Sequence, residues 1–205
     1  MSYVIPFSNG QKGREMRQTH SRSPAGHSII AQVEAYWSDQ RNGAAVPARS
    51  DINPRGIEAA LSHAFIIERV APGIARFRLA GGHLCDLMGM DVRGMPITTM
   101  MDTDARVGLV TPLEAVFKKP AIAKFSLLSP RSIARPAINA TMALFPLTDS
   151  QGDVTRALGC LISETRIGRT PRRFALEDVQ VNEIGKPRPQ VYTNGAHLRL
   201  VSSRD

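Results

Sequence analysis

The sequence predicts an α+β fold with a five-stranded antiparallel sheet, and three observations lead to it. The runs "AFIIERV" (64–70) and "IARFRLA" (74–80) are extended, and the Ala-Pro-Gly between them is typical of a hairpin. Three more extended runs follow Pro120, separated by proline or Gly-Asp turns. Helical spacing marks the segments before and between these groups of strands. Helices, two strands, short helices and three strands, in that order, indicate an α+β domain.

The N-terminal helix is expected to begin at Ile29, with Ser28 as its cap. Its apolar residues recur at helical spacing and form one face that must pack on something. They are Ile29, Ile30, Val33, Tyr36 and Trp37. A second, short helix is expected over about residues 55–62. Asn53 suits its cap, and Pro54 suits its first turn, where a missing N–H costs nothing.

The second strand of the hairpin alternates in character. Ala75, Phe77 and Leu79 are expected on one face, and Arg76 and Arg78 on the other. Such alternation is typical of a strand that is buried on one side.

A double glycine, Gly81-Gly82, follows this strand and permits backbone angles that are closed to other residues. A short helix over residues 83–88 is then expected, ended by Gly89.

A longer helix is expected over about residues 105–119, capped by Asp104 and broken or kinked at Pro112. The three extended runs after it are "AIAKFSLLS", "AINATMALFPL" and "ALGCLISET". In the last run, Leu158, Cys160 and Ile162 share one face.

The charge distribution separates the chain into a body and two basic ends. The net charge is +8, of which the residues before 29 carry +3, residues 29–165 carry +1, and residues from 166 onward carry +4. We expect a disordered basic segment at 1–28, one domain at 29–165 and a basic C-terminal extension at 166–205, in which "HLRLV" resembles an added strand. Basic tails attract anionic partners without reading sequence, so a nucleic-acid-associated regulator that uses these tails is the alternative function, and a solvated tail is the simpler expectation.

The sequence shows no targeting signal and no cysteine framework. No apolar run approaches the ~20 residues of a membrane-spanning helix, and the N-terminus lacks the apolar stretch of a signal peptide. Two cysteines, Cys85 and Cys160, form neither a disulfide framework nor a metal spacing. The simplest expectation is a cytoplasmic protein with no membrane partner.

Two stretches combine into a specific pattern, "AYWSDQRNGAAVPARSDINPRGI" (35–57) and "RFRLAGGHLCDLMGMDVRG" (76–94). With the later "LFPL" and "LGCL", they resemble the PAS domain family over about residues 29–165. The closest resemblance is to the single-domain PAS proteins of alphaproteobacteria, which carry one PAS core behind an N-terminal helix. The matching residues are Trp37, Arg41, Pro47, Arg49, Asp51 and Pro54, then Arg78, Gly81, Leu84, Gly89 and Gly94.

This resemblance implies a PAS fold with short helices on one face of the sheet, and a sensory or protein-interaction module without enzymatic activity. It also implies a pocket between sheet and helices, because the sheet of such a fold curls around its short helices. The expected lining residues are Phe77, Leu84, Met88, Met95, Ile97, Leu158 and Ile162. The alternative is a filled core without a ligand, since aliphatic residues at helical spacing usually just pack.

Other chemistry is expected to be absent. His83 and Cys85 lie two residues apart, so on a helix they point in different directions and do not share a metal. His83 is a poor candidate for a haem ligand, and Cys85 lacks the Asn-Cys-Arg setting of flavin-adduct domains, so it is expected to be a small buried hydrophobe. No nucleophile elbow, phosphate loop or metal motif is present, which argues against an enzyme. An isomerase on a curled sheet is the weakest alternative.

The N-terminal helix and the loop after it are the expected interaction surface for a signalling partner and for a homodimer. The interaction residues are Tyr36, Trp37, Arg41, Arg49 and Asp51. Two alternatives stay open from the sequence. The helix can fold back and bury Trp37 on its own sheet, and Arg49 and Asp51 can serve an ion pair and the start of the next helix.

Overall fold

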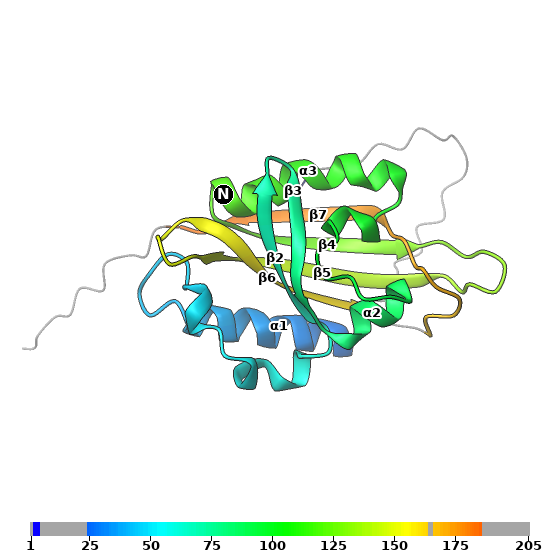
Figure 1. Ribbon diagram of the computed structural model, residues 1–205, viewed down its shortest axis with the longest axis horizontal. Coiled ribbons are helices and arrows are strands. Elements are labelled where there is room, and N and C mark those ends of the chain that lie inside the picture. Colours follow the sequence, from blue (N-terminus) through cyan, green and yellow to red (C-terminus); the bar gives the residue numbers. More distant parts are fainter. Residues whose placement is uncertain (1, 5–23, 164–165, 186–205) are drawn as a thin grey trace, which may run out of the picture.

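Within the residues that the computed structural model describes (2–4, 24–163 and 166–185), one antiparallel sheet runs in the order β1-β7-β4-β5-β6-β2-β3. Figure 1 shows this sheet as the middle layer, with helices on both sides. The strands are β1 (Ser2–Val4), β2 (Ala64–Ala71), β3 (Ile74–Ala80), β4 (Ala121–Ser129), β5 (Ile138–Thr148), β6 (Val154–Ser163) and β7 (Ala175–Glu183). The α+β fold and its antiparallel sheet are confirmed; β2 to β6 are the five predicted strands, and β7 and β1 extend them at one edge.

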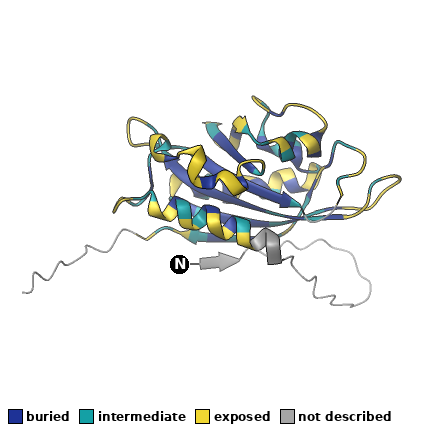
Figure 2. Ribbon diagram, turned by 90° about the horizontal axis from the view of Figure 1, so that it is seen from below, coloured by how far each residue is buried: buried dark blue, intermediate teal, exposed yellow. Residues whose placement is uncertain are grey.

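The helices divide between the two faces of the sheet. We call the face that carries α2 (Gly82–Met88), η3 (Ile97–Met100) and α3 (Thr103–Lys118) the inner face. The outer face carries α1 (Pro24–Asp39) and the 3-10 helix η2 (Pro54–Ala60), with the short turn η1 (Arg49–Asp51) beside them. Figure 2 shows buried residues concentrated in the sheet and exposed ones on the outward sides of the helices.

The inner face holds the larger of two separate apolar clusters. Side chains of β2 to β7 meet those of α2, η3 and α3 there, and most of them are fully buried. Burial of so many apolar side chains is the main force that holds the helices on this face. The largest are Phe65, Phe77, Phe125, Phe174, Ile67, Leu84, Leu87, Ile97 and Met100.

The outer face is covered mainly by α1. Ile30, Val33 and Trp37 are buried against the sheet, and the Trp37 indole N–H donates to the Pro146 carbonyl at 2.8 Å. The Trp37 ring also packs against Phe145, with ring centroids 5.9 Å apart. The predicted apolar stripe of this helix is therefore used inside the molecule.

Three helix boundaries differ from the prediction. The first helix begins at Pro24 rather than Ile29, so Ser28 is not its cap. The second is a 3-10 helix that ends at Ala60, although Asn53 does accept the Arg55 N–H as expected.

The long helix is the third case. It is capped by Asp102, whose Oδ1 accepts the Ala105 N–H at 2.8 Å, and not by Asp104. An aspartate two residues earlier offers the same cap, which the sequence pattern alone could not rank. The helix also continues through Pro112, which is buried in its middle.

The face assigned to Leu79 was wrong because β3 contains a β-bulge. Ile66 pairs with Leu79 and Ile67 with Phe77, so Arg78 is an extra residue in β3. Paired residues share a face, and Ile66 belongs to the outer cluster. Leu79 therefore points to the outer face, opposite Phe77, and is 51% exposed.

The domain is larger at both ends than predicted. Ser2–Val4 pairs with β7, and α1 includes residues 24–28, so the expected disordered segment 1–28 is wrong at both ends. Ala175–Glu183 pairs along β4, with Val179 and Val181 fully buried, so part of the expected extension 166–205 belongs to the sheet. Residues 5–23 and the expected strand "HLRLV" lie outside the described residues.

Candidate ligand pocket on the outer face of the sheet

The inner-face residues predicted to line a pocket are packed instead. Phe77, Leu84, Met88 and Ile97 are at most 2% exposed and belong to the inner cluster. Met95 is half-buried and packs against that cluster. These five side chains fill space that a ligand would need, so the alternative of a filled core describes this face.

The remaining two predicted lining residues face the other way. Leu158 and Ile162 belong to the outer cluster, because Leu158 pairs with Ile66 across β2 and β6. The prediction that they share a face with Cys160 is confirmed, but that face is not the one that holds Phe77. The predicted set therefore straddles the sheet and cannot line one cavity.

A pocket of about 560 Å³ lies under η2 at the β2–β3 end of the sheet. Most of the strand residues that line it face outward, but Phe65, Ala80 and Cys85, which belong to or pack on the inner cluster, line it too. Its floor is Ile66, Leu79 and Leu158, one residue from each of β2, β3 and β6. The chain around η2 supplies an apolar wall, formed by Ile52, Pro54, Ile57 and Leu61. A space of this size, lined mainly by apolar side chains, is typical of a small-molecule site.

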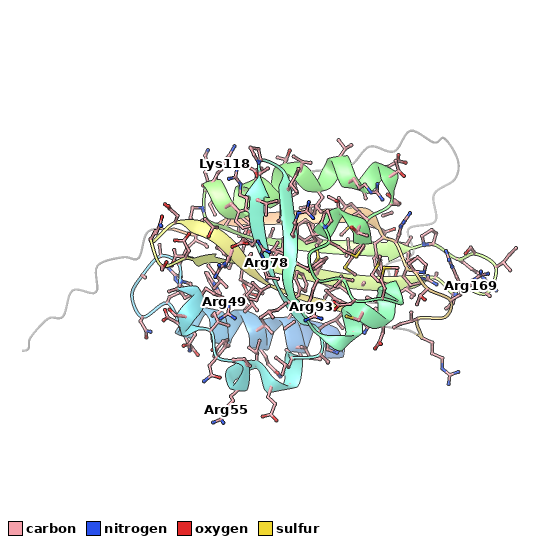
Figure 3. The ribbon with its side chains drawn as sticks, viewed as in Figure 1. Arg49, Arg55, Arg78, Arg93, Lys118 and Arg169 are labelled. Atoms are coloured by element: carbon pink, nitrogen blue, oxygen red, sulfur yellow. The ribbon has the colours of Figure 1, made fainter. Side chains whose placement is uncertain are left out.

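Two arginines lie at the rim of this pocket and differ in their partners. Arg93 is paired with Asp91, with its Nε 2.7 Å from Oδ2, and this contact lowers the pKa of Asp91. Arg49 is half-buried, and its Nη1 has one hydrogen bond, 3.4 Å long, to the Ile52 carbonyl. Within the described part of the chain, no carboxylate lies within ion-pair distance of Arg49. Figure 3 labels both side chains, Arg49 from the turn η1 and Arg93 from the segment after α2.

Gly81, the first of the two adjacent glycines, closes one edge of the pocket by a close backbone approach. A Cβ at Gly81 would lie 2.3 Å from the Ser62 carbonyl oxygen, so no other residue fits there. The Gly81 N–H donates to the Ala64 carbonyl at 2.8 Å, which brings the start of α2 against the start of β2. The backbone of Gly81 has a φ of −70°, so its role is this contact and not an unusual backbone angle.

A histidine pair flanks the same edge. The rings of His63 and His83 are 4.6 Å apart, and His83 Nε2 lies 3.1 Å from the Ser163 hydroxyl. Burial lowers the pKa of His83 to about 4, and the neighbouring His63 adds to this effect. His83 is therefore neutral at neutral pH. The half-buried Cys85 lines the pocket, which corrects its expected burial.

The side chains that could ligate a metal or act as a nucleophile lie singly or in pairs in the described residues. No group of three or more His, Cys, Asp or Glu side chains converges there. Burial raises the pKa of the Cys160 thiol, which lies under α1, to about 12, so this thiol is a poor nucleophile at neutral pH.

The residues predicted to contact a partner make contacts inside the molecule. Trp37 is 1% exposed, so its expected place on a dimer surface is wrong, and the alternative of a helix folded onto its own sheet is what the structure shows. Tyr36 Oη accepts the Asn53 N–H at 2.7 Å and so links α1 to the start of η2. Arg41 lies over the Trp37 ring at 5.7 Å, and Asp51 accepts the Ala48 N–H at 3.1 Å within its own turn. Of the predicted interaction residues, Arg49 lines the pocket.

Sequence reasoning missed most of the pocket. Ile52 and Ile57 flank the Asn53-Pro54 start of η2, and apolar residues beside a short irregular helix are a weak signal of a wall. Leu79 could not be found, because the bulge at Arg78 reverses its direction. Arg93 is far from Arg49 in sequence, so only the fold brings them to one rim.

A family model identifies the family to which most of the chain is similar. A family model described as "PAS domain" matches residues 25–162, which is more than half of the chain. No curated protein matches it. Several solved structures are similar to this chain, among them the following two. The light-state structure of the blue-light photoreceptor Aureochrome1 LOV is 16% identical, with a TM-score of 0.39, over 55% of this chain and 88% of that one. An RNA-binding light-oxygen-voltage receptor is 14% identical, with a TM-score of 0.37, over 79% of this chain and 38% of that one.

Proposed function

We propose, from the premise that the chain belongs to the PAS domain family, that it is a regulatory module acting through protein contacts and gated by a small ligand. The family is typically sensory rather than catalytic, and no helix of the described residues is long and apolar enough to cross a membrane. A cytoplasmic, non-enzymatic role and a homodimer stay predictions, as does membership of the alphaproteobacterial single-domain group. The observation that carries the proposal is the outer-face pocket of about 560 Å³ beside a filled inner face.

The ligand of this proposal is a small amphiphile with an apolar body and one acidic group. Ile66, Leu79 and Leu158 suit an aliphatic or aromatic body. Arg49 offers a guanidinium without a carboxylate partner among the described residues, and a guanidinium binds a carboxylate through two parallel hydrogen bonds.

Gating follows from what the pocket wall is connected to. Ile57 is the kinked position of η2, and the start of η2 is tied to α1 through Tyr36 and Asn53. A ligand that occupies the pocket favours one position of η2 over the others, and α1 responds through this link. A ligand shifts such an equilibrium only by its difference in affinity for the two positions.

The proposal is tested by the fluorescence of a dansyl-labelled undecanoic acid titrated with the full chain. Leu79→Trp fills the floor of the pocket and is expected to abolish binding. Val107→Trp is the matched control, because Val107 is 78% exposed on α3, away from the pocket. Arg49→Gln is expected to weaken binding about tenfold, since hydrogen bonds to charged groups contribute roughly 1.5–3 kcal/mol.

The acidic group is tested separately with dodecanol, which has no charge. Arg49→Gln is expected to leave the dissociation constant of dodecanol unchanged, once the weaker binding of the displaced probe is taken into account. Arg55→Gln serves as the control for charge alone, because Arg55 is exposed on η2 and does not line the pocket. Equal binding of the dansyl-labelled acid by the wild-type chain and Leu79→Trp would show that the acid does not bind in this pocket.

A further inference from the structure

A second surface lies at the end of the sheet where the β4–β5 hairpin meets the segment before β7. We call it the arginine end and define it as residues 129–137, "SPRSIARPA", and 166–174, "RIGRTPRRF". These two segments contain six arginines and no lysine, aspartate or glutamate. Figure 1 shows the hairpin projecting beyond the body of the molecule, and Figure 3 shows Arg169 at that end.

A buried arginine holds the two segments together. Arg172 is 1% exposed; its Nε donates to the Ser129 hydroxyl at 3.1 Å and its Nη2 to the Pro136 carbonyl at 2.6 Å. Burial and the nearby Arg135 lower the pKa of Arg172. The Arg169 N–H donates to the Ala134 carbonyl at 3.3 Å, so backbone contacts also cross between the segments. The surface is therefore held in place before any partner arrives.

The other arginines of this end are not neutralised by the described residues. Arg131, Arg166, Arg169 and Arg173 are exposed, and none of them makes an ion pair with a described carboxylate. Asp102 lines a pocket together with Arg135 and Arg173, but it makes no ion pair with either of them, and its Oδ1 accepts the Ala105 N–H at the start of α3. Like charges that lie close together repel one another, and this repulsion destabilises the folded state. Binding of an anionic partner would relieve it and is therefore favoured.

An apolar side chain is exposed among these arginines. Ile133 is 93% exposed between Arg131 and Arg135. The arginine end has one aromatic residue, Phe174, which is fully buried, so no ring is available to stack on a base. Arginine in place of lysine, together with an apolar anchor, is the composition that protein interfaces favour.

We infer that the arginine end docks an acidic segment of another protein that also carries apolar side chains. Carboxylates of the partner pair with the exposed guanidinium groups, and one apolar residue of the partner covers Ile133. This inference rests on the proposal that the chain acts through protein contacts, and it names the surface and the chemistry of the partner. The ligand pocket contains no residue of either segment, so the two sites can be tested apart.

The experiment measures how tightly the full chain binds two fluorescent probes. One is a soluble peptide in which single leucines are spaced among glutamates, and the other is a short RNA duplex. The test variants are the double substitution Arg131→Gln/Arg169→Gln and the single substitution Ile133→Ser. The control is Arg55→Gln/Arg106→Gln, which removes the same charge from two exposed arginines outside the arginine end.

We expect the double test variant to bind the peptide at least tenfold more weakly, Ile133→Ser to weaken it about threefold, and the control to change little. Equal weakening by the control would overturn the inference, because the attraction would then be a property of net charge. Tighter binding of the RNA duplex, insensitive to Ile133→Ser, would assign the surface to nucleic acid instead. The dansyl-labelled acid should bind the double variant normally, so failure of the ligand proposal is distinguishable from failure of this one.

Discussion

The two faces of the sheet have similar residues but differ in how completely they are covered. On the inner face, the sixteen-residue helix α3 together with α2 and η3 buries Phe77, Leu84 and Ile97 fully. On the outer face, α1 covers the middle strands, but the β2–β3 end is left to the seven-residue 3-10 helix η2. A 3-10 helix packs less regularly than an α-helix. Coverage, rather than apolar composition, therefore decides which face retains a pocket.

The bulge in β3 adds to this difference. An extra residue at Arg78 leaves Phe77 on the filled face and turns Leu79 to the hollow one. Bulges commonly re-aim a side chain at the edge of a sheet, where β3 lies. Phe77 and Leu79, which simple alternation would place on one face, therefore lie on different faces. Substituting each of them tests whether the two faces differ in packing.

The largest effect is expected from Phe77→Ala. Phe77 is fully buried in the inner cluster, with its ring edge-on to Phe65 at 5.4 Å. Removing such a ring leaves a cavity and should lower the free energy of unfolding by roughly 3–5 kcal/mol. Urea denaturation followed by circular dichroism measures this loss. A change below about 1 kcal/mol, on the same scale, would mean that the inner face is not packed as described.

A smaller effect is expected from pH acting on His83. Its pKa is lowered from 6.5 to about 4, so the unfolded chain takes up the proton first. Stability should therefore be fully present above pH 6.5 and fall as the pH drops from 6.5 towards 4, by an amount on the order of 2 kcal/mol. The measurement compares the pH dependence of unfolding in the wild-type chain and His83→Gln. Identical slopes in this window would contradict the burial of His83.

A smaller loss of stability is expected from substituting Trp37, the most deeply buried aromatic residue of α1 on the outer face. Trp37→Phe keeps an aromatic ring against Phe145 but removes the hydrogen bond to the Pro146 carbonyl. The expected loss of stability is about 1–2 kcal/mol, since a buried carbonyl loses its donor. Thermal unfolding at several protein concentrations measures it and also tests the dimer prediction. A shift in oligomeric state without a loss of stability would contradict the burial of Trp37 and support its place on a dimer surface.

The smallest effect is expected from Leu79→Ala. Leu79 is 51% exposed on the pocket floor, so its truncation removes little buried area and should cost less than about 1 kcal/mol. The same substitution should weaken binding of the dansyl-labelled acid. Denaturation and titration of the same sample separate these two outcomes. A loss as large as that of Phe77→Ala would show that the outer face is filled as well.

Much of the fold was predictable because its signals are local. The hairpin, the end of α2 at Gly89 and the start of η2 at Asn53 follow from turn and capping chemistry within a few residues. Strand β7 carries its own alternation, with Val179 and Val181 buried, but it lies inside the stretch from residue 166 onward that was predicted as a basic extension.

The site was less predictable because it depends on relations between distant segments. Alternation shows that Leu158 and Ile162 share a face, but not which helices cover that face. The direction of Leu79 depends on how two strands pair, and the rim of the pocket joins Arg49 to Arg93 only through the fold. Strand pairing, helix coverage and contacts between distant residues cannot be predicted from a pattern within a few residues.

The most direct test of the account is methyl NMR of the full chain titrated with dodecanoate. If the ligand space lies on the outer face, the methyl signals of Ile57, Ile66 and Leu79 should shift in a saturable way. Those of Met88, Ile97 and Met100 in the filled inner cluster should stay in place. Saturable shifts in the inner set, with the outer set unchanged, would place the ligand on the inner face instead.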